Sequence, residues 1–384
     1  MPSDPDDRAT LVKVAREAGV SLAAASMGLR NHPRISLQTR KRVQIAAKKL
    51  GYKPDPQISR LMWHLRNSKT VKYQETLAFL SDNAQLAGWV SYSQADYYLG
   101  AADRAGELGY RMEVFHLRAP GLTQTGLGRM LRNRGIRGLI TSAFREPGAT
   151  LSLDWQHFAT VACGYSLANP EVDRVTTDYY RAMLKATEML AQSGCKRIGL
   201  CLNTSDDTKV LHLWQSAFLF YQHHLPARRQ LPIHELSAVT WELMTASSPK
   251  AKPRLPVRGA PAGKNDLHAW FRATRPDAVI SAGCDFPLEY AQTTGRPAPA
   301  RVRYCNMNIH HADARSCGID QASYLVGRHA CSHLVALLTR NELGLPGHPQ
   351  TTLTEFRWID DWNEWHDGWL KRNTRLQSSI HTTK

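Results

Sequence analysis

Residues 10–62 read TLVKVAREAGVSLAAASMGLRNHPRISLQTRKRVQIAAKKLGYKPDPQISRLM. Apolar residues recur at helical spacing from Leu11 onwards, and Gly19 then follows, as is typical just after a helix. Ser21 is a good N-cap for a second helix over residues 21–29. Because only three or four residues join the two helices, they must cross at a steep angle. This pattern predicts a helix-turn-helix, a motif whose second helix enters the major groove of DNA.

A third helix is expected to begin after Ser36 and to end near Gly51. Its apolar residues fall on one side and its basic residues on the other, which is the pattern of a helix packed on a small core with a charged outer face. The inward residues are Val43, Ala46, Ala47 and Leu50, and the outward ones are Arg40, Lys41, Arg42, Lys48 and Lys49.

The basic charge of the chain is concentrated at its start. Lys and Arg number 49 against 33 Asp and Glu, which gives a formal net charge of +16. Residues 1–72 hold 15 of the basic and 5 of the acidic residues, a net charge of +10, and the remaining 312 residues carry only +6. A basic headpiece on a nearly neutral body is typical of a nucleic-acid binder. The alternative is a helical bundle with a basic, solvated face.

The rest of the composition is that of a folded, cytoplasmic protein. A chain of 384 residues with 42% hydrophobic residues predicts two or three packed units. No apolar run reaches the length of roughly 18 residues that a membrane span needs, and the acidic N-terminus does not resemble a secretory signal. The seven Cys are widely spaced and form no C-x-x-C pair, which favours neither disulfides nor a zinc site.

The ordered motifs of residues 10–62 carry a family resemblance. They are T-L-x-x-V-A-x-x-A-G-V-S, then S-x-x-T-R-x-x-V, then L-G-Y-x-P and a following leucine. They resemble the headpiece of the LacI/GalR (lactose-repressor/galactose-repressor) family of bacterial transcription regulators. The resemblance implies that residues 1–62 form a DNA-binding headpiece in which residues 55–62 are a hinge helix that folds on DNA.

The same resemblance implies roles for individual headpiece residues. Thr10 and Ser21 would contact phosphates, and Leu61 would enter a minor-groove step as an apolar wedge. The base-reading positions depart from the usual polar ones, so that readout would depend on contacts with thymine methyl groups. The residues expected to contact DNA are Thr10, Ser21, Leu22, Ala23, Met27, Arg30, Asn31 and Leu61.

After a linker over residues 63–74, the chain alternates between predicted strands and helices. This alternation favours parallel, doubly wound α/β sheets with helices on both faces. Residues 75–384 resemble the periplasmic-binding-protein-like effector and dimerisation domain of the same family, which has two lobes with a ligand cleft between them. The resemblance implies one lobe at about 75–191 and 322–348, and another at about 192–321 and 349–384.

The resemblance also places effector-binding residues in the cleft. Asp178 would accept hydrogen bonds from the hydroxyls of a sugar, and Trp214 and Asn308 stand where the family usually has an arginine and an aspartate. Trp214 would stack on a sugar or a planar ligand, or else pack as an ordinary core residue. Asp285 is a further effector-binding candidate, and Tyr97, Tyr98 and Arg145 are weaker ones.

Three other features were open to more than one interpretation. His223-His224 and His310-His311-x-Asp313 lack the spacing of a metal site, so no metal is expected. The basic, proline-rich residues 250–264 form either a solvated loop or an additional attraction for DNA. Tryptophans at 358, 362, 365 and 369 have helical spacing and would pack on their own lobe or on another subunit.

Together these patterns predict a cytoplasmic, sequence-specific transcription regulator, a repressor, that is neither an enzyme nor dependent on a cofactor. We expect a homodimer on a pseudo-palindromic DNA operator, controlled by a sugar or sugar derivative bound in the cleft and making no contact with a membrane. The alternative is a sugar-binding or sugar-processing protein with a vestigial headpiece.

Overall fold

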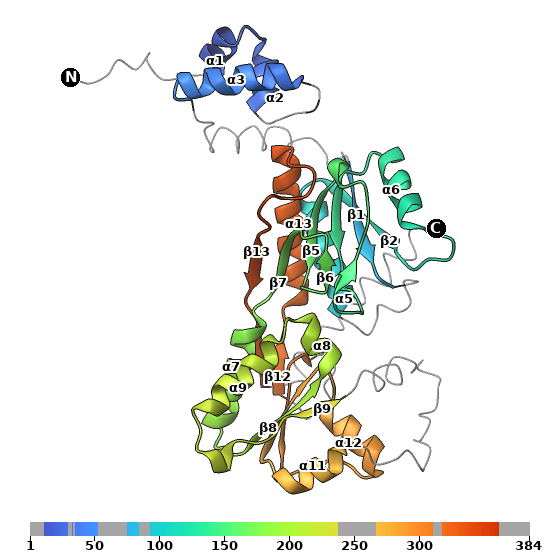
Figure 1. The fold of residues 1–384 in the computed structure, drawn as a ribbon, viewed down its shortest axis with the longest axis vertical. Coiled ribbons are helices and arrows are strands. Elements are labelled where there is room, and N and C mark those ends of the chain that lie inside the picture. The colour runs from blue at the N-terminus through green and yellow to red at the C-terminus, as the bar shows by residue number, and fades with distance from the viewer. Residues whose placement is uncertain are drawn as a thin grey trace, which may run out of the picture.

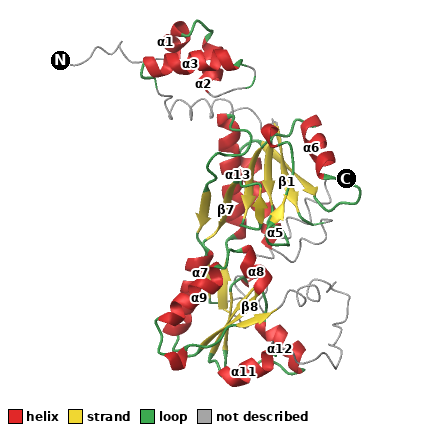
Figure 2. Cartoon of the chain, viewed as in Figure 1, coloured by secondary structure: helices red, strands yellow, loops and turns green. Residues whose placement is uncertain are grey.

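The computed structural model describes residues 11–29, 33, 35–52, 75–83, 93–236, 266–309 and 317–360. They form a helical headpiece and two α/β lobes, each built on its own six-stranded sheet (Figures 1 and 2). The predicted fold class is therefore confirmed. Within the described part of the chain, no helix is long and apolar enough to cross a membrane.

The headpiece contains the three predicted helices. These are α1 (Leu11–Glu17), α2 (Leu22–Leu29) and α3 (Leu37–Lys49). Ser36 caps α3, because its Oγ accepts a hydrogen bond from the backbone N–H of Thr39 at 3.2 Å. The helices enclose a small core made of Val14, Ala15, Ala18, Ala25, Val43, Ala46 and Ala47.

The first lobe has a wholly parallel sheet in the strand order β13-β7-β5-β3-β1-β2. Helices α5 and α13 cover one face of this sheet, and α6 covers the other. The strands are β1 (Glu75–Ser81), β2 (Tyr110–His116), β3 (Gly138–Thr141), β5 (Ala159–Cys163), β7 (Asp173–Thr177) and β13 (Thr351–Thr354), and the helices are α5 (Ser93–Glu107), α6 (Gln124–Asn133) and α13 (Ser323–Arg340). A short pair, β4 (Ala149–Thr150) and β6 (Leu167–Asn169), and the 3₁₀ turn η3 (Trp155–His157) complete the lobe.

The second lobe has the strand order β14-β12-β11-β10-β8-β9, in which only the edge strand β14 is antiparallel to its neighbour. Helices α7 and α9 pack on one face, and α11 and α12 on the other. The strands are β8 (Ile198–Asn203), β9 (His234–Leu236), β10 (Ala278–Ala282), β11 (Arg303–Asn306), β12 (Cys317–Asp320) and β14 (Arg357–Ile359). The helices are α7 (Tyr179–Gln192), α8 (Thr204–Lys209), α9 (Leu213–His223), α11 (Leu267–Thr274) and α12 (Phe286–Thr294), with the 3₁₀ turn η4 (Ala227–Arg229).

The predicted lobe boundaries are wrong in two places. Strand β13, which we expected in the second lobe, pairs with β7 of the first sheet, with Thr352 opposite Val175. Helix α7, which we expected in the first lobe, buries Met183 and Leu190 in the core of the second. The chain therefore crosses between the lobes directly after β7, after β12 and after β13.

Several predicted features lie outside the described residues. They are Thr10, Arg30, Asn31, the hinge segment with Leu61, the linker 63–74, the basic segment 250–264, His310, His311 and Asp313, and the tryptophans at 362, 365 and 369. Trp358 is described, and it lies in strand β14 rather than in the predicted helix, with its Nε1 donating a hydrogen bond to Asp360 Oδ1 at 2.6 Å.

Helices α5 and α13 approach each other more closely than side chains would allow. A Cβ atom added to Gly100 of α5 would collide with the backbone carbonyl of Tyr324, and one added to Gly327 of α13 would collide with that of Tyr97. The two glycines thus let the helix backbones touch. This contact joins the start of the lobe's first helix to its last helix, although more than 200 residues separate them in sequence.

We predict that Gly327→Ala destabilises the protein by about 3 kcal/mol, because the new methyl group meets backbone that cannot move aside. Gly106→Ala is the matched control, since nothing lies within 4 Å of a Cβ at that position in α5. The control should be neutral or up to about 1 kcal/mol more stable, because alanine has the higher helix propensity. Urea denaturation followed by circular dichroism measures both, and equal stability of the two variants would contradict the close contact.

Candidate functional site

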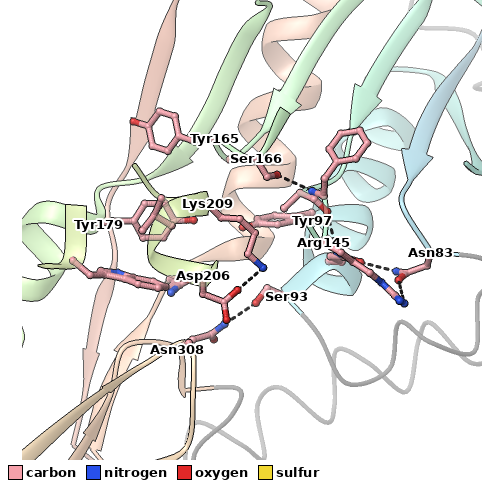
Figure 3. A pocket seen from close by; sticks show the side chains of 18 residues that line it. Asn83, Ser93, Tyr97, Arg145, Tyr165, Ser166, Tyr179, Asp206, Lys209 and Asn308 are labelled. Carbon is pink, nitrogen blue, oxygen red and sulfur yellow. Dashed lines mark hydrogen bonds and ion pairs between the residues drawn. The ribbon is translucent and has the colours of Figure 1, made fainter. Parts of the chain in front are cut away.

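A cavity lies between the lobes, at the carboxyl ends of their strands (Figure 3). It encloses about 150 Å³ and opens to solvent at its mouth. From the first lobe, Asn83 follows β1 and Arg145 follows β3. From the second lobe, Asp206 follows β8 and Asn308 follows β11. Ligands in doubly wound sheets bind at such strand ends, where the following loops diverge.

One wall of the cavity is aromatic. Tyr179 lies edge-to-face with Trp214, with ring centroids 5.6 Å apart, and its ring is 6.5 Å from that of Tyr165. Burial raises the pKa values of Tyr179 and of the neighbouring Tyr97, so both phenols stay protonated at neutral pH. Trp214 is 4% exposed, and its Nε1 has no hydrogen-bond acceptor among the described residues. The wall therefore combines apolar ring surface with hydrogen-bond donors.

The polar groups of the cavity come from both lobes. Asp206 and Lys209 of α8 form an ion pair in the second lobe. In the first lobe, Arg145 Nη2 donates to Asn83 Oδ1 at 3.0 Å. A direct bond joins the two sides, because Nδ2 of Asn308 donates to Ser93 Oγ at 2.9 Å. Figure 3 shows these groups around the cavity.

The turn between α8 and α9 positions both Lys209 and Trp214. Leu211 and His212 in this turn both have φ near +58°, a conformation that costs non-glycine residues about 1–3 kcal/mol each. The carboxylate of Asp207 holds the turn closed: its Oδ2 lies 2.9 Å from Nδ1 of His212, and its Oδ1 accepts from the backbone N–H of Gln215 at 3.3 Å. Burial raises the pKa of Asp207, and the hydrogen bond with His212 opposes that effect.

Glycine at position 283, after β10, permits helix α8 to pack tightly against this loop. A Cβ on Gly283 would stand 2.6 Å from the Cβ of Asp206, and the backbone there has φ +70°. Any other residue would push Asp206 away and open this side of the cavity.

The structure brings together only some of the predicted effector residues. Trp214 and Asn308 line the cavity. Asp178 does not: it caps α7, where its Oδ1 accepts from the backbone N–H of Arg181 at 3.1 Å. Asp285 does not either, because it caps α12 in the same way through the N–H of Leu288. Both aspartates follow a strand and precede a helix, and at each position the carboxylate caps the helix and does not line the cavity.

Of the three weaker effector-binding candidates, two line the cavity and one does not. Tyr97 and Arg145 line the cavity, whereas Tyr98 packs edge-to-face on Phe79 in the core, with centroids 5.5 Å apart. Sequence reasoning missed Asp206 and Lys209. Both lie in α8, which begins directly after the predicted strand GLCLN, and the rule that ligands bind at strand ends could have identified them.

The headpiece is described less completely than the cavity. Ser21 Oγ accepts from the backbone N–H of Ala24 at 3.2 Å, which places Ser21 at the start of α2. Met27 is partly exposed on the same helix. The side chains of Leu22 and Ala23 lie outside what the structure describes. Lys41, Arg42 and Lys48 are exposed on α3, while Lys49 pairs with Glu17 at 2.6 Å.

Among the described residues, no group of three or more His, Cys, Asp and Glu side chains could hold a metal ion. His223 and His224 lie at the end of α9 with their rings 5.6 Å apart and nearly perpendicular.

The comparisons with known proteins point to regulators. Residues 10–55 match the family described as "Bacterial regulatory proteins, lacI family". The HTH-type transcriptional regulator CelR of Thermobifida fusca is 27% identical over 339 residues, which cover 86% of this chain and 92% of that protein. The regulator MalR of Streptococcus pneumoniae is 25% identical over 190 residues, 49% of this chain and 55% of its own length, so the chain spans about half of that relative.

Solved structures agree on the fold. A transcriptional regulator CelR–cellobiose complex superposes with a TM-score of 0.50 at 20% identity, covering 92% of this chain and 99% of that one. A transcriptional regulator from Rhizobium etli, described as of the LacI family, gives a TM-score of 0.51 at 14% identity, covering 76% of this chain and 98% of that one. At these identities the likeness supports the fold alone.

One buried acid of the second lobe has a consequence for stability. Glu289 of α12 is 3% exposed, and its Oε1 has no hydrogen-bond partner among the described residues. Burial, together with the charge of nearby Asp285, raises the pKa of Glu289 to about 7. Between pH 4.5 and 7 the unfolded chain gives up this proton while the folded chain keeps it, so stability falls as the pH rises through this range.

We therefore predict that Glu289→Gln stabilises the protein by about 3 kcal/mol at pH 8. The gain should disappear below about pH 4.5, where the carboxyl is protonated in both states. Urea denaturation at pH 4.5 and at pH 8 measures the difference. Glu171→Gln, at an exposed position, is the control and should change little at either pH. A gain that is the same at both values would contradict the raised pKa.

Proposed function

The chain belongs to the LacI/GalR family of bacterial transcription regulators, and we propose that it is a sequence-specific DNA-binding repressor controlled by a small molecule. The observation that carries this proposal is the combination of two separate parts. One is the three-helix headpiece, whose sequence matches the family. The other is a cavity lined from both lobes of an α/β body. In such an arrangement the free energy of ligand binding can be coupled to a change in DNA affinity.

In this proposal α2 is the recognition helix. Ser21 at its start, with Thr10, contacts phosphates, and Leu22, Ala23 and Met27 meet base edges. Arg30, Asn31 and the hinge residue Leu61 complete the contacts. The protein acts as a homodimer, because two identical headpieces then read the two halves of a pseudo-palindromic operator.

The effector occupies the interlobe cavity and is carbohydrate-related. Trp214, Asn308, Asp206, Lys209 and Arg145 form its binding site. The cellobiose complex of the similar regulator supports a sugar-like ligand, as does the mixture of aromatic and amide side chains in the cavity. A ligand that contacts both lobes favours one lobe arrangement over another, and it shifts DNA affinity only by that difference.

We further propose that the protein works in the cytoplasm and is not an enzyme. The relatives named as transcriptional regulators support both statements. The alternative, a sugar-binding or sugar-processing protein with a vestigial headpiece, has no need of selective DNA binding. Sequence-selective binding therefore discriminates between the two.

We predict that the protein selects a defined operator from a pool of random duplexes, and that Met27→Ala weakens binding to that operator about tenfold. Ile45→Ala is the matched control, because Ile45 is 68% exposed on α3, outside the recognition helix. Gel-shift titrations at fixed salt measure both variants. Equal affinity for every duplex, fading uniformly with salt, would contradict a specific regulator.

A further inference from the structure

The charged groups of the cavity do not balance. Among its described lining residues the charged ones are Asp206, Lys209 and Arg145. Asp206 and Lys209 neutralise each other as an ion pair. Arg145 directs Nη2 to the neutral amide oxygen of Asn83, not to a carboxylate. The carboxylate of Asp82 accepts a hydrogen bond from the backbone N–H of Arg145 at 2.9 Å, and it forms its ion pair with Arg118 at 2.8 Å. The described lining therefore carries a net charge of about +1.

The hydrogen-bonding groups are also biased towards donors. Arg145 lines the cavity with a planar guanidinium that has five N–H donors, and the phenols of Tyr97 and Tyr179 line it as well. The acceptor expected for a neutral sugar, the carboxylate of Asp178, is used in capping α7.

From these observations we propose that the cavity binds an acidic sugar, that is, a uronate or aldonate whose carboxylate meets Arg145. The inference rests on the proposed effector-controlled function and specifies its ligand. Arginine recognises a carboxylate with two parallel N–H donors, and such charge-assisted bonds are stronger than neutral ones. A neutral sugar leaves the excess positive charge of the cavity uncompensated.

The remaining lining groups suit the sugar part of the ligand. The rings of Trp214, Tyr179 and Tyr165 offer an apolar wall for the C–H faces of a sugar. The side chains of Asn308 and Gln321 can both donate and accept, as sugar hydroxyls require. A purely aromatic carboxylate has no hydroxyls to exchange hydrogen bonds with these amides, and so it would use only the Arg145 part of the site.

The two cations stand on opposite lobes, which connects the ligand class to regulation. Arg145 follows β3 of the first lobe, and Lys209 ends α8 of the second (Figure 3). A ligand whose carboxylate meets Arg145 and whose hydroxyls reach the Asp206–Lys209 pair contacts both lobes, so that its binding free energy depends on how close the lobes are. The Asp207–His212 contact fixes the turn that carries Lys209, so the second lobe offers a preorganised partner.

The test uses the full-length protein and matched pairs of ligands. D-Glucuronate, D-galacturonate and D-gluconate are compared with D-glucose and D-galactose, and with benzoate as an aromatic acid, by thermal shift and isothermal titration calorimetry. We expect at least one sugar acid to raise the Tm by several degrees at millimolar concentration, because a ligand that binds only the folded state stabilises it. The neutral sugars and benzoate should have no comparable effect.

Variants then locate the interaction. Arg145→Gln should weaken binding of the sugar acid by about tenfold or more and abolish its preference over the neutral sugar. Trp214→Phe keeps an aromatic ring but offers the sugar a smaller apolar face, and it should weaken binding of the sugar acid severalfold without abolishing its preference over the neutral sugar. Arg129→Gln is the control, because it removes an exposed arginine of α6 that does not line the cavity. This variant should bind like the unmodified protein.

Three results would overturn the acidic-sugar assignment. They are a neutral sugar binding as tightly as the acids, benzoate binding more tightly than any sugar acid, and no acid in the panel binding at all. An unchanged preference in Arg145→Gln would also overturn it. Operator selection by the ligand-free protein is measured in parallel. If selection persists in any of these cases, only the ligand assignment fails; if selection itself is absent, the proposed regulatory function fails.

Discussion

The direct backbone contact between α5 and α13 is the constraint on which the cavity depends. Tyr97 lines the cavity, and its carbonyl rests against Gly327 of α13. The same helix α13 begins just after Gln321, another lining residue at the second crossover between the lobes. One contact therefore fixes both the first-lobe wall and a connection to the second lobe. Because the packed helices leave no room for an added methyl group, the two glycines determine how closely α5 and α13 approach each other.

The crossovers couple the lobes through hydrogen bonds as well as through the chain. At the first two crossovers, Thr177 Oγ1 donates to the backbone carbonyl of Gln321 at 2.6 Å. Gln321 Nε2 in turn donates to the carbonyl of Met307 at 2.7 Å in the second lobe. These buried bonds hold the strand ends together at one side of the cavity, whereas Asn308 and Ser93 meet across it. Ligand contacts across the cavity can thus change the lobe angle while the crossover side stays fixed.

The sequence predicted local features well and long-range ones less well. The three headpiece helices were predicted because caps, glycines and apolar spacing act within a few residues. The α/β class followed from the same local alternation. The placement of β13 could not be predicted in this way, because it depends on pairing with β7, more than 170 residues earlier. Strand pairing at such a distance leaves no periodic signal in either segment.

The capping roles of Asp178 and Asp285 have a common physical origin. Each aspartate follows a strand end, where ligands bind, but each also precedes a helix whose first N–H groups need an acceptor. The N–H groups of the helix need this acceptor in every molecule, whereas a ligand needs it only when it is bound. A carboxylate engaged in a cap offers a ligand less of its acceptor capacity. The charged side chains of the described lining instead come from residues that do not cap a helix, such as Arg145. The turn at Leu211 and His212 also has a local cost. Its positive φ values lower the stability of the turn, and the turn holds Lys209 and Trp214 in fixed positions.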